Sequence, residues 1–168
     1  MNGSEAGRVD QPDGVALRDG RPEDGVAVAG VFGAARAEMR YLPVLHSQEE
    51  HVVFFSTRVL PTSRVTVAEV AGEVVAFSAV NDGWLDHLYV APAHQRRGIG
   101  RALLGRAMSE NPGGLSLWAF VANRRAIAFY ERAGFVELLR TDGSANEERE
   151  PDVQMRWSGP LRGSRPGR

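Results

Sequence analysis

The sequence of 168 residues contains no cysteine and no lysine. Without cysteine there can be no disulfide, no thiolate metal ligand and no cysteine nucleophile. All 20 side chains of the Lys/Arg class are arginine, which excludes Schiff-base chemistry on lysine and the phosphate-binding lysine of a P-loop. The formal net charge of -1 leaves no large positive field for attracting nucleic acid or an anionic membrane.

Long apolar runs are also missing. No stretch approaches the roughly 18 consecutive apolar residues that suggest a membrane helix, and the polar start, MNGSEAGRVDQPDG, lacks the apolar core of a secretory signal. We therefore expect a cytoplasmic protein that binds neither membrane nor nucleic acid. The length suits one domain, which we place at residues 14–158, between a disordered N-terminus (1–13) and a flexible Arg/Gly/Pro tail (159–168).

Hydrophobic periodicity predicts alternating strands and helices. Helices are expected at 22–41, 47–60, 98–110 and 123–133, and strands at 15–20, 64–70, 73–81, 84–90, 115–121, 135–140 and 152–157. Ser47 and Glu50 have the spacing of a capping box, Pro61 is expected to follow the end of that helix, and Ala71-Gly72 reads as a hairpin turn. This order predicts an α/β fold with a mixed sheet and helices on both faces.

The stretch HQRRGIGRALL (94–104) joins a predicted strand to a predicted helix. Gly98 and Gly100 allow backbone amides to approach a ligand closely, and the helix N-terminus adds unpaired donors and a partial positive charge. Full positive charges come from Arg96, Arg97 and Arg101. Together these features predict an anion site suited to a phosphate or pyrophosphate. The structural alternative is a loop whose glycines serve only for turning and whose arginines serve only for solubility.

Two common phosphate motifs do not fit this stretch. A Rossmann fingerprint requires a third glycine three residues after the second, and that position is Leu103. A P-loop requires lysine after its last glycine, whereas Gly100 is followed by arginine.

Residues 95–100, QRRGIG, instead match the Q/R-x-x-G-x-G/A motif A of the GCN5-related N-acetyltransferase (GNAT) superfamily. Further on, NRRAIAFYERAGFVE (123–137) resembles motif B of that family. With both motifs in this order and spacing, the chain resembles the GNAT superfamily over residues 15–157. The resemblance implies a mostly antiparallel sheet with a splayed central pair of strands. It also implies acetyl transfer from acetyl-CoA to a primary amine of a small molecule or peptide; a non-catalytic acyl-CoA-binding module is the alternative.

The same resemblance implies where acetyl-CoA binds. It assigns the cofactor to the main chain of Leu88, Tyr89 and Val90, to Arg96, Arg97, Gly98, Ile99, Gly100 and Arg101, and to Asn123 and Tyr130. The amide of Val90 would polarise the thioester carbonyl, and Tyr130 stands where the family usually has its general acid. Many members of the family dimerise, so a homodimer is compatible with the resemblance.

Motifs A and B do not assign the general base or the residues that bind the acceptor. Some family members place a base at positions equivalent to 84 or 86, which makes Asp86 the first candidate and His46 the second. Strand alternation predicts one face carrying Trp84, Asp86, Leu88 and Val90. On the acceptor side we expect His46, Glu49 and Trp84, whereas His51 is expected to be plain surface. No histidine has metal-ligand spacing, so no metal is predicted.

Overall fold

The computed structural model describes residues 11–160, and the predictions for residues 1–10 and 161–168 lie outside this part. One seven-stranded sheet has the order β1-β2-β3-β4-β5-β7-β6. Its strands are β1 (Val15–Asp19), β2 (Arg64–Val70), β3 (Glu73–Asn81), β4 (Trp84–Val90), β5 (Leu115–Phe120), β6 (Val136–Arg140) and β7 (Asp152–Trp157). Neighbouring strands are antiparallel except β4 and β5, which confirms the predicted mixed, mostly antiparallel sheet.

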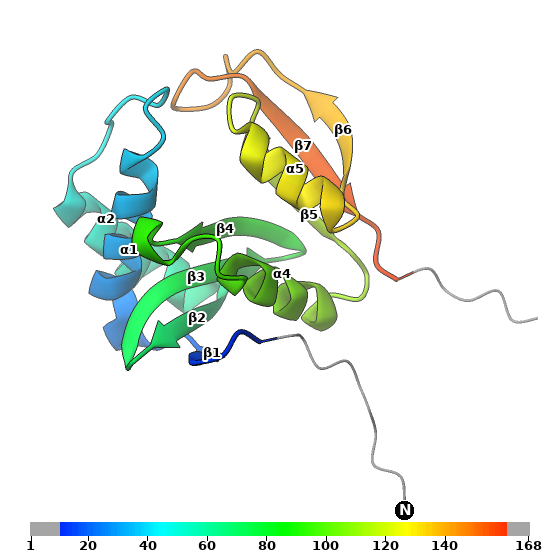
Figure 1. Cartoon of the computed structure of the whole chain (residues 1–168). Coiled ribbons are helices and arrows are strands. Elements are labelled where there is room, and N and C mark those ends of the chain that lie inside the picture. Colours follow the sequence, from blue (N-terminus) through cyan, green and yellow to red (C-terminus); the bar gives the residue numbers. More distant parts are fainter. Residues whose placement is uncertain (1–10, 161–168) are drawn as a thin grey trace, which may run out of the picture.

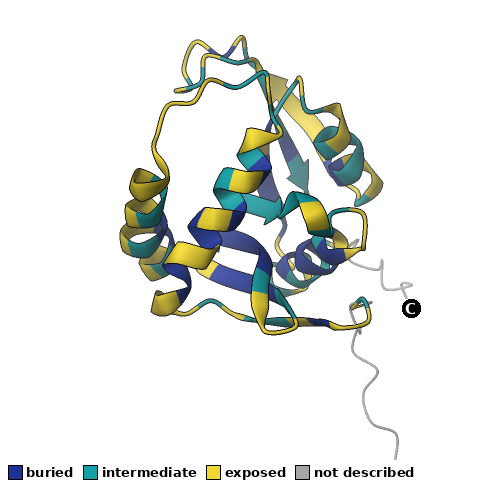
Figure 2. Cartoon of the chain, turned by 60° about the vertical axis from the view of Figure 1, so that its left-hand side comes forward, coloured by how far each residue is buried: buried dark blue, intermediate teal, exposed yellow. Residues whose placement is uncertain are grey.

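Helices cover both faces of this sheet, as predicted (Figure 1). The helices are α1 (Gly25–Ala37), α2 (Gln48–Phe54), α3 (Leu60–Thr62), α4 (Ile99–Glu110) and α5 (Arg124–Arg132). Val28 of α1 packs with Phe77 of β3, whereas Leu103 of α4 packs with Ala76, the preceding residue of the strand, on the opposite face. Figure 2 shows the resulting buried sheet between helices with exposed outer faces. Within residues 11–160, no helix combines the length and apolar character needed to cross a bilayer.

The first helix is shorter than predicted. A 3-10 turn, η1 (Pro22–Asp24), precedes α1, and α1 ends at Ala37 instead of continuing to residue 41. The chain then turns so that the ring of Tyr41 packs edge-on against Phe120 of β5, with 6.2 Å between ring centroids. The helical periodicity of the sequence up to residue 41 therefore does not fix the end of α1. The Tyr41–Phe120 contact places the connection between α1 and α2 against the second half of the sheet.

The second helix is longer than predicted, because it continues through Pro61 to Thr62. Directly before the proline it widens into a π-helical segment, η2 (Phe55–Val59), in which Leu60 N–H donates to Phe55 O. Proline has no N–H and its ring clashes with the carbonyl four residues earlier in an α-helix, so the wider turn accommodates it. The prediction that Pro61 follows the helix end is therefore wrong.

Two glycines of α1 differ in what surrounds them. A Cβ at Gly25 would collide with the side chain of Ser56 in η2, whereas a Cβ at Gly30 would meet nothing within 4 Å. We expect Gly30→Ala to raise the free energy of unfolding by about 0.5–1 kcal/mol and Gly25→Ala to lower it. Urea denaturation measures both, and a stabilised Gly25→Ala variant would contradict the close packing of α1 on η2.

The parallel pair β4 and β5 is splayed, as the family resemblance implied. The two strands are joined at one residue pair only, Trp84 with Ser116. Beyond that pair the strands separate, so the C-terminal half of β4 has no strand partner on its β5 side. The molecule thus contains a gap in the middle of its sheet, close to the loop that follows β4.

A β-bulge interrupts β4 near its start. In the register with β3, Leu85 and His87 have partners and Asp86 has none. The extra residue reverses the alternation of side chains, and Leu85 packs in the same apolar cluster as Leu88. The prediction that Trp84, Asp86 and Leu88 share one face is therefore wrong, because alternation alone cannot reveal a bulge.

Candidate active site

The loop between β4 and α4 leaves a row of backbone amides free. Arg96 (φ 61°) and Gly98 (φ 80°) both adopt left-handed backbone conformations. The first hydrogen bond of α4 runs from Ala102 N to Gly98 O at 3.0 Å, so the amides of residues 99–101 have no acceptor within the helix. No side chain caps this helix end and no acidic residue lies in its first turn. The predicted anion site thus has the required donors.

The positive charge of this loop is uncompensated. The side chains of Arg96, Arg97 and Arg101 are exposed and form no ion pair with any residue between 11 and 160. Gln95 Nε2 donates to Val90 O at 3.1 Å and so fixes the start of the loop to the end of β4. Free amides, a helix N-terminus and unpaired guanidinium groups together suit a phosphate-bearing anion.

The backbone of β4 presents further free groups toward the gap in the sheet. Ala91 N donates to Val75 O at 2.8 Å, so the backbone groups at position 91 face β3. Because backbone groups alternate along a strand, those of Tyr89 also face β3, and those of Leu88 and Val90 face the gap. The Val90 N–H is thus available to an extended ligand lying between β4 and β5.

We call residues 91–98, which join β4 to α4, together with the first turn of α4, the anion loop. Gly100 lies where this loop meets the gap in the sheet. A Cβ at this position would be 3.6 Å from Val90 Cγ2 and 3.8 Å from Phe129 Cζ. These are ordinary van der Waals distances, so a methyl group fits there. A larger side chain would extend into the space between the end of β4 and α5.

All three tyrosines of the chain gather beside the gap. Tyr130 of α5 is 9% exposed, and its ring centroid lies 5.5 Å from that of Phe135. Burial raises the pKa of Tyr130, and the neighbouring Tyr89 adds to the shift. Burial likewise raises the pKa values of Tyr41 and Tyr89. All three phenols therefore stay protonated at neutral pH and can donate hydrogen bonds.

The position of Tyr130 depends on how α5 begins. Asn123 Oδ1 accepts a hydrogen bond from Ala126 N at 3.1 Å, which confirms the predicted cap of this helix. The helix is strongly amphipathic, and Tyr130 is its buried residue. The cap thus sets where α5 starts, and the helical turns carry the phenol to the sheet beside the gap.

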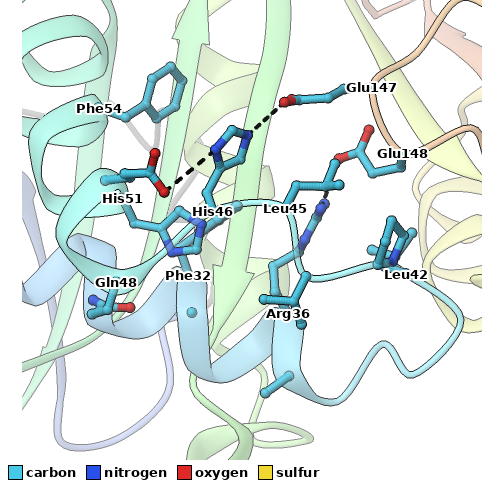
Figure 3. Close-up of a pocket in the computed structure, with 15 residues that line it drawn as sticks. Phe32, Arg36, Leu42, Leu45, His46, Gln48, His51, Phe54, Glu147 and Glu148 are labelled. Carbon is cyan, nitrogen blue, oxygen red and sulfur yellow. Dashed lines mark hydrogen bonds and ion pairs between the residues drawn. The ribbon is translucent and has the colours of Figure 1, made fainter.

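A second feature is a cavity of about 520 Å³ between α1, α2 and the two connections α1–α2 and β6–β7 (Figure 3). Its size falls within the range of about 300–1,000 Å³ typical of small-molecule sites. The large apolar side chains that line it are Phe32, Leu42, Pro43, Val44, Leu45 and Phe54. The polar and charged side chains that line it are Arg36, His46, Gln48, Glu50, His51, Glu147 and Glu148. The cavity is a candidate acceptor site because Arg36 in its wall lies close enough to Tyr41 and Tyr89 for its charge to act on both phenols.

Arg36 is the single guanidinium in the wall of this cavity, and it is already paired. Its Nη2 donates to Glu148 Oε1 at 2.8 Å, across 112 residues of sequence. Its guanidinium carbon also lies 5.5 Å from the ring centroid of Phe32 and 5.7 Å from that of Phe120. The pair links α1 to the β6–β7 connection; Figure 3 labels both side chains.

His46 lies between two carboxylates at the cavity rim. Its Nε2 is 2.7 Å from Glu147 Oε1, and its Nδ1 is 3.9 Å from Glu50 Oε2. These side chains are largely exposed, so the contacts add little to stability. Glu50 also completes the predicted capping box, since its carboxylate accepts from Ser47 N at 2.7 Å. In residues 11–160, no group of three or more His, Asp or Glu side chains is arranged to hold a metal ion.

His51 is a cavity residue that the sequence analysis missed. Its ring packs edge-on against Phe32 at 4.9 Å, and its Nδ1 is buried with no hydrogen-bonding partner in residues 11–160. Burial lowers the pKa of His51, and the neighbouring His46 and Arg36 act in the same direction. The imidazole is therefore neutral at pH 7. Helical spacing could have identified it, because Gln48, His51 and Phe54 recur every third residue on one face.

Two residues predicted for the acceptor side, Glu49 and Trp84, and the first candidate for the base, Asp86, lie outside this cavity. Glu49 is exposed and borders a separate shallow surface with Val53 and Arg58. Trp84 and Asp86, at the start of β4, are not in the cavity wall. Although the Asp86 residue is exposed, nearby protein atoms partly desolvate its carboxyl group and raise its pKa. Of the acceptor-side predictions, the structure brings only His46 to the cavity.

Sequence comparisons identify related proteins over part of the chain. Residues 61–137 match the family model of the acetyltransferase (GNAT) domain. An uncharacterized N-acetyltransferase of Methanocaldococcus jannaschii is 35% identical over 86 residues, which cover 42% of this chain and 38% of that protein. The peptidyl-lysine N-acetyltransferase YiaC of Escherichia coli is 37% identical over 70 residues, covering 41% of this chain and 47% of that protein. The chain thus matches less than half the length of these two relatives.

Structural comparison extends over most of the chain. The structure of yncA from Salmonella typhimurium, with its cofactor acetyl-CoA, superposes with a TM-score of 0.69 at 18% sequence identity. The superposition covers 90% of this chain and 97% of yncA. At this level of identity the likeness concerns the fold alone.

Proposed function

We propose that this chain, which matches the acetyltransferase (GNAT) family model over residues 61–137 and resembles N-acetyltransferases in sequence, transfers an acetyl group from acetyl-CoA to a primary amine. The observation that carries the proposal is the row of free amides at the start of α4, next to a strand whose backbone faces a gap in the sheet. The acceptor amine binds in the cavity lined by α1, α2 and the β6–β7 connection.

The residues present fit acetyl-CoA as the co-substrate. The amides of residues 98–101 and the neighbouring arginines hold its pyrophosphate. The main chain of Leu88 and Val90 lies along the pantetheine arm, and Asn123 faces it from the start of α5. The Val90 N–H donates a hydrogen bond to the thioester carbonyl and stabilises the negative charge that develops on its oxygen.

The chemistry requires one nucleophile and two proton transfers. The neutral amine nitrogen forms a bond to the thioester carbon, and the bond from that carbon to sulfur breaks. Tyr130 supplies a proton to the departing thiolate, and a base removes one proton from the amine nitrogen. The products are the acetylated amine and free coenzyme A thiol.

The two candidate bases differ in position. His46 lines the cavity and its Nε2 contacts Glu147, which orients the ring, whereas Asp86 lies outside the cavity wall. We therefore propose His46 as the base. His46→Gln is expected to lower kcat/KM by about 10²-fold, a typical contribution of general-base catalysis.

The dependence of kcat/KM on pH in an Asp86→Asn variant tests whether Asp86 is the base. Partial desolvation raises the pKa of the Asp86 carboxyl group, so a base at this position would act above that pKa and lose activity as pH falls through it. We expect the Asp86→Asn variant to keep the wild-type dependence of kcat/KM on pH. Loss of the acidic limb in this variant would instead place the base on β4.

The function itself is tested by calorimetric titration with acetyl-CoA, with NAD and ATP as controls, followed by detection of released thiol with a panel of amines. Selective binding of acetyl-CoA and amine-dependent thiol release are expected. Binding without turnover across the panel would favour a non-catalytic acyl-CoA-binding module. Absence of acetyl-CoA binding would overturn the proposal.

A further inference from the structure

We propose that the cavity accepts a primary amine carried on an apolar body, with no carboxylate beside the amine. This inference rests on the proposed acetyl transfer and concerns only which amines are acetylated. Two observations carry it: the apolar character of the cavity walls and the absence of a free cation among the residues that line it.

The walls favour an apolar ligand. The rings of Phe32 and Phe54 and the side chains of Leu42 and Leu45 face the cavity. The apolar surface continues onto the rim, where Val44 is 95% exposed and Phe54 is 44% exposed. An apolar ligand would remove this surface from water. A sugar would place several of its hydroxyl groups against the apolar part of these walls, where they find no hydrogen-bonding partner.

The charged side chains that line the cavity disfavour an acceptor with a carboxylate beside its amine. The residues lining the cavity include three carboxylates, on Glu50, Glu147 and Glu148, and one guanidinium, on Arg36. Arg36 is held by Glu148 at 2.8 Å, so it has no free charge for a second anion. His51 does not supply one, because its lowered pKa keeps it neutral. His46 already lies against Glu147. The carboxylate of a free amino acid would therefore meet repulsion and no unpaired cation.

Two sources offer the same ligand chemistry. A free arylalkylamine and the N-terminal residue of a peptide both present an amine on an apolar group without an adjacent carboxylate. The test therefore uses phenethylamine, phenylalanine amide, a phenylalanyl dipeptide amide, phenylalanine and glucosamine. Each kcat/KM is referred to the concentration of neutral amine, because the amines differ in basicity.

We expect phenylalanine amide to exceed phenylalanine in kcat/KM by about 100-fold, as for a ligand that leaves a buried charge unpaired, and glucosamine to be a poor acceptor. Of the two favoured probes, higher activity with phenethylamine indicates a free amine, and higher activity with the dipeptide amide indicates a peptide. Equal or greater activity with phenylalanine or glucosamine would overturn the inference and leave acetyl transfer intact. No turnover with any amine would overturn the proposed function and the inference with it.

A gain of activity provides the sharper test. Glu148→Gln removes the charge that holds Arg36, so the guanidinium becomes available to a ligand carboxylate. We expect the preference for phenylalanine amide over phenylalanine to fall by about tenfold in this variant, through a rise in activity with phenylalanine. A rise cannot result from misfolding.

The matched control is Glu38→Gln. Glu38 is exposed at the end of α1 and does not line the cavity, so the same change of charge there should leave the preference as in the wild type. An unchanged preference in Glu148→Gln, or an equal change in both variants, would overturn the role assigned to the Arg36–Glu148 pair.

Discussion

Replacing Gly100 with leucine is expected to weaken acetyl-CoA binding by at least about 100-fold, or roughly 2.7 kcal/mol. The Cβ of a residue at this position points toward Val90 Cγ2 and Phe129 Cζ, and the rest of a leucine side chain would enter the space between β4 and α5. The proposed path of acetyl-CoA, from the anion loop to the Val90 amide, runs through this space. Isothermal titration with acetyl-CoA measures the loss.

Gly100→Ala is the matched control for this substitution. Its Cβ would lie 3.6 Å and 3.8 Å from its nearest neighbours, which are ordinary contact distances, so binding should be retained. Both substitutions replace glycine within a helix and favour the helical conformation by up to about 1 kcal/mol. The melting temperatures of the free variants should therefore not fall. Wild-type affinity in Gly100→Leu would show that the cofactor does not pass this position.

The parts of the fold that sequence patterns predicted are those fixed by local interactions. The turn at Ala71-Gly72 has positive φ angles of 51° and 80°, as the hairpin signal requires. The anion loop also lies within a few consecutive residues, between the end of β4 and the first turn of α4. Its glycines, arginines and helix start are therefore visible in the sequence as one motif.

The features that were missed depend on contacts across the chain or on local backbone irregularity. Two polar contacts hold opposite walls of the cavity together. Arg36 and Glu148 are 112 residues apart in sequence, and His46 and Glu147 are 101 residues apart. No local pattern marks these glutamates, which belong to a connection rich in charge. The bulge at Asp86 and the π-helical segment before Pro61 escape periodicity for a different reason, since each inserts one residue into a regular repeat.

Tyr130→Phe is expected to lower kcat by about 10²-fold, a typical contribution of a general acid, with little change in acetyl-CoA affinity. The substitution keeps the ring that packs against Phe135 and removes only the hydroxyl group. Because burial raises the pKa of this phenol, it is protonated and able to donate at neutral pH. In the wild type, ionisation of Tyr130 should begin to lower kcat only above the usual pKa range of tyrosine.

Tyr41→Phe is the matched control, because Tyr41 is a second, half-buried phenol beside the gap, whose buried hydroxyl oxygen has no hydrogen-bonding partner in residues 11–160. Loss of an unpartnered hydroxyl should leave the melting temperature unchanged or raised, and kcat should fall far less than in Tyr130→Phe. Rapid-mixing measurement of thiol release separates the chemical step from product release. If Tyr130→Phe leaves that step unchanged, the thiolate departs without a proton from Tyr130, and the buried phenol serves only to position α5 against the sheet.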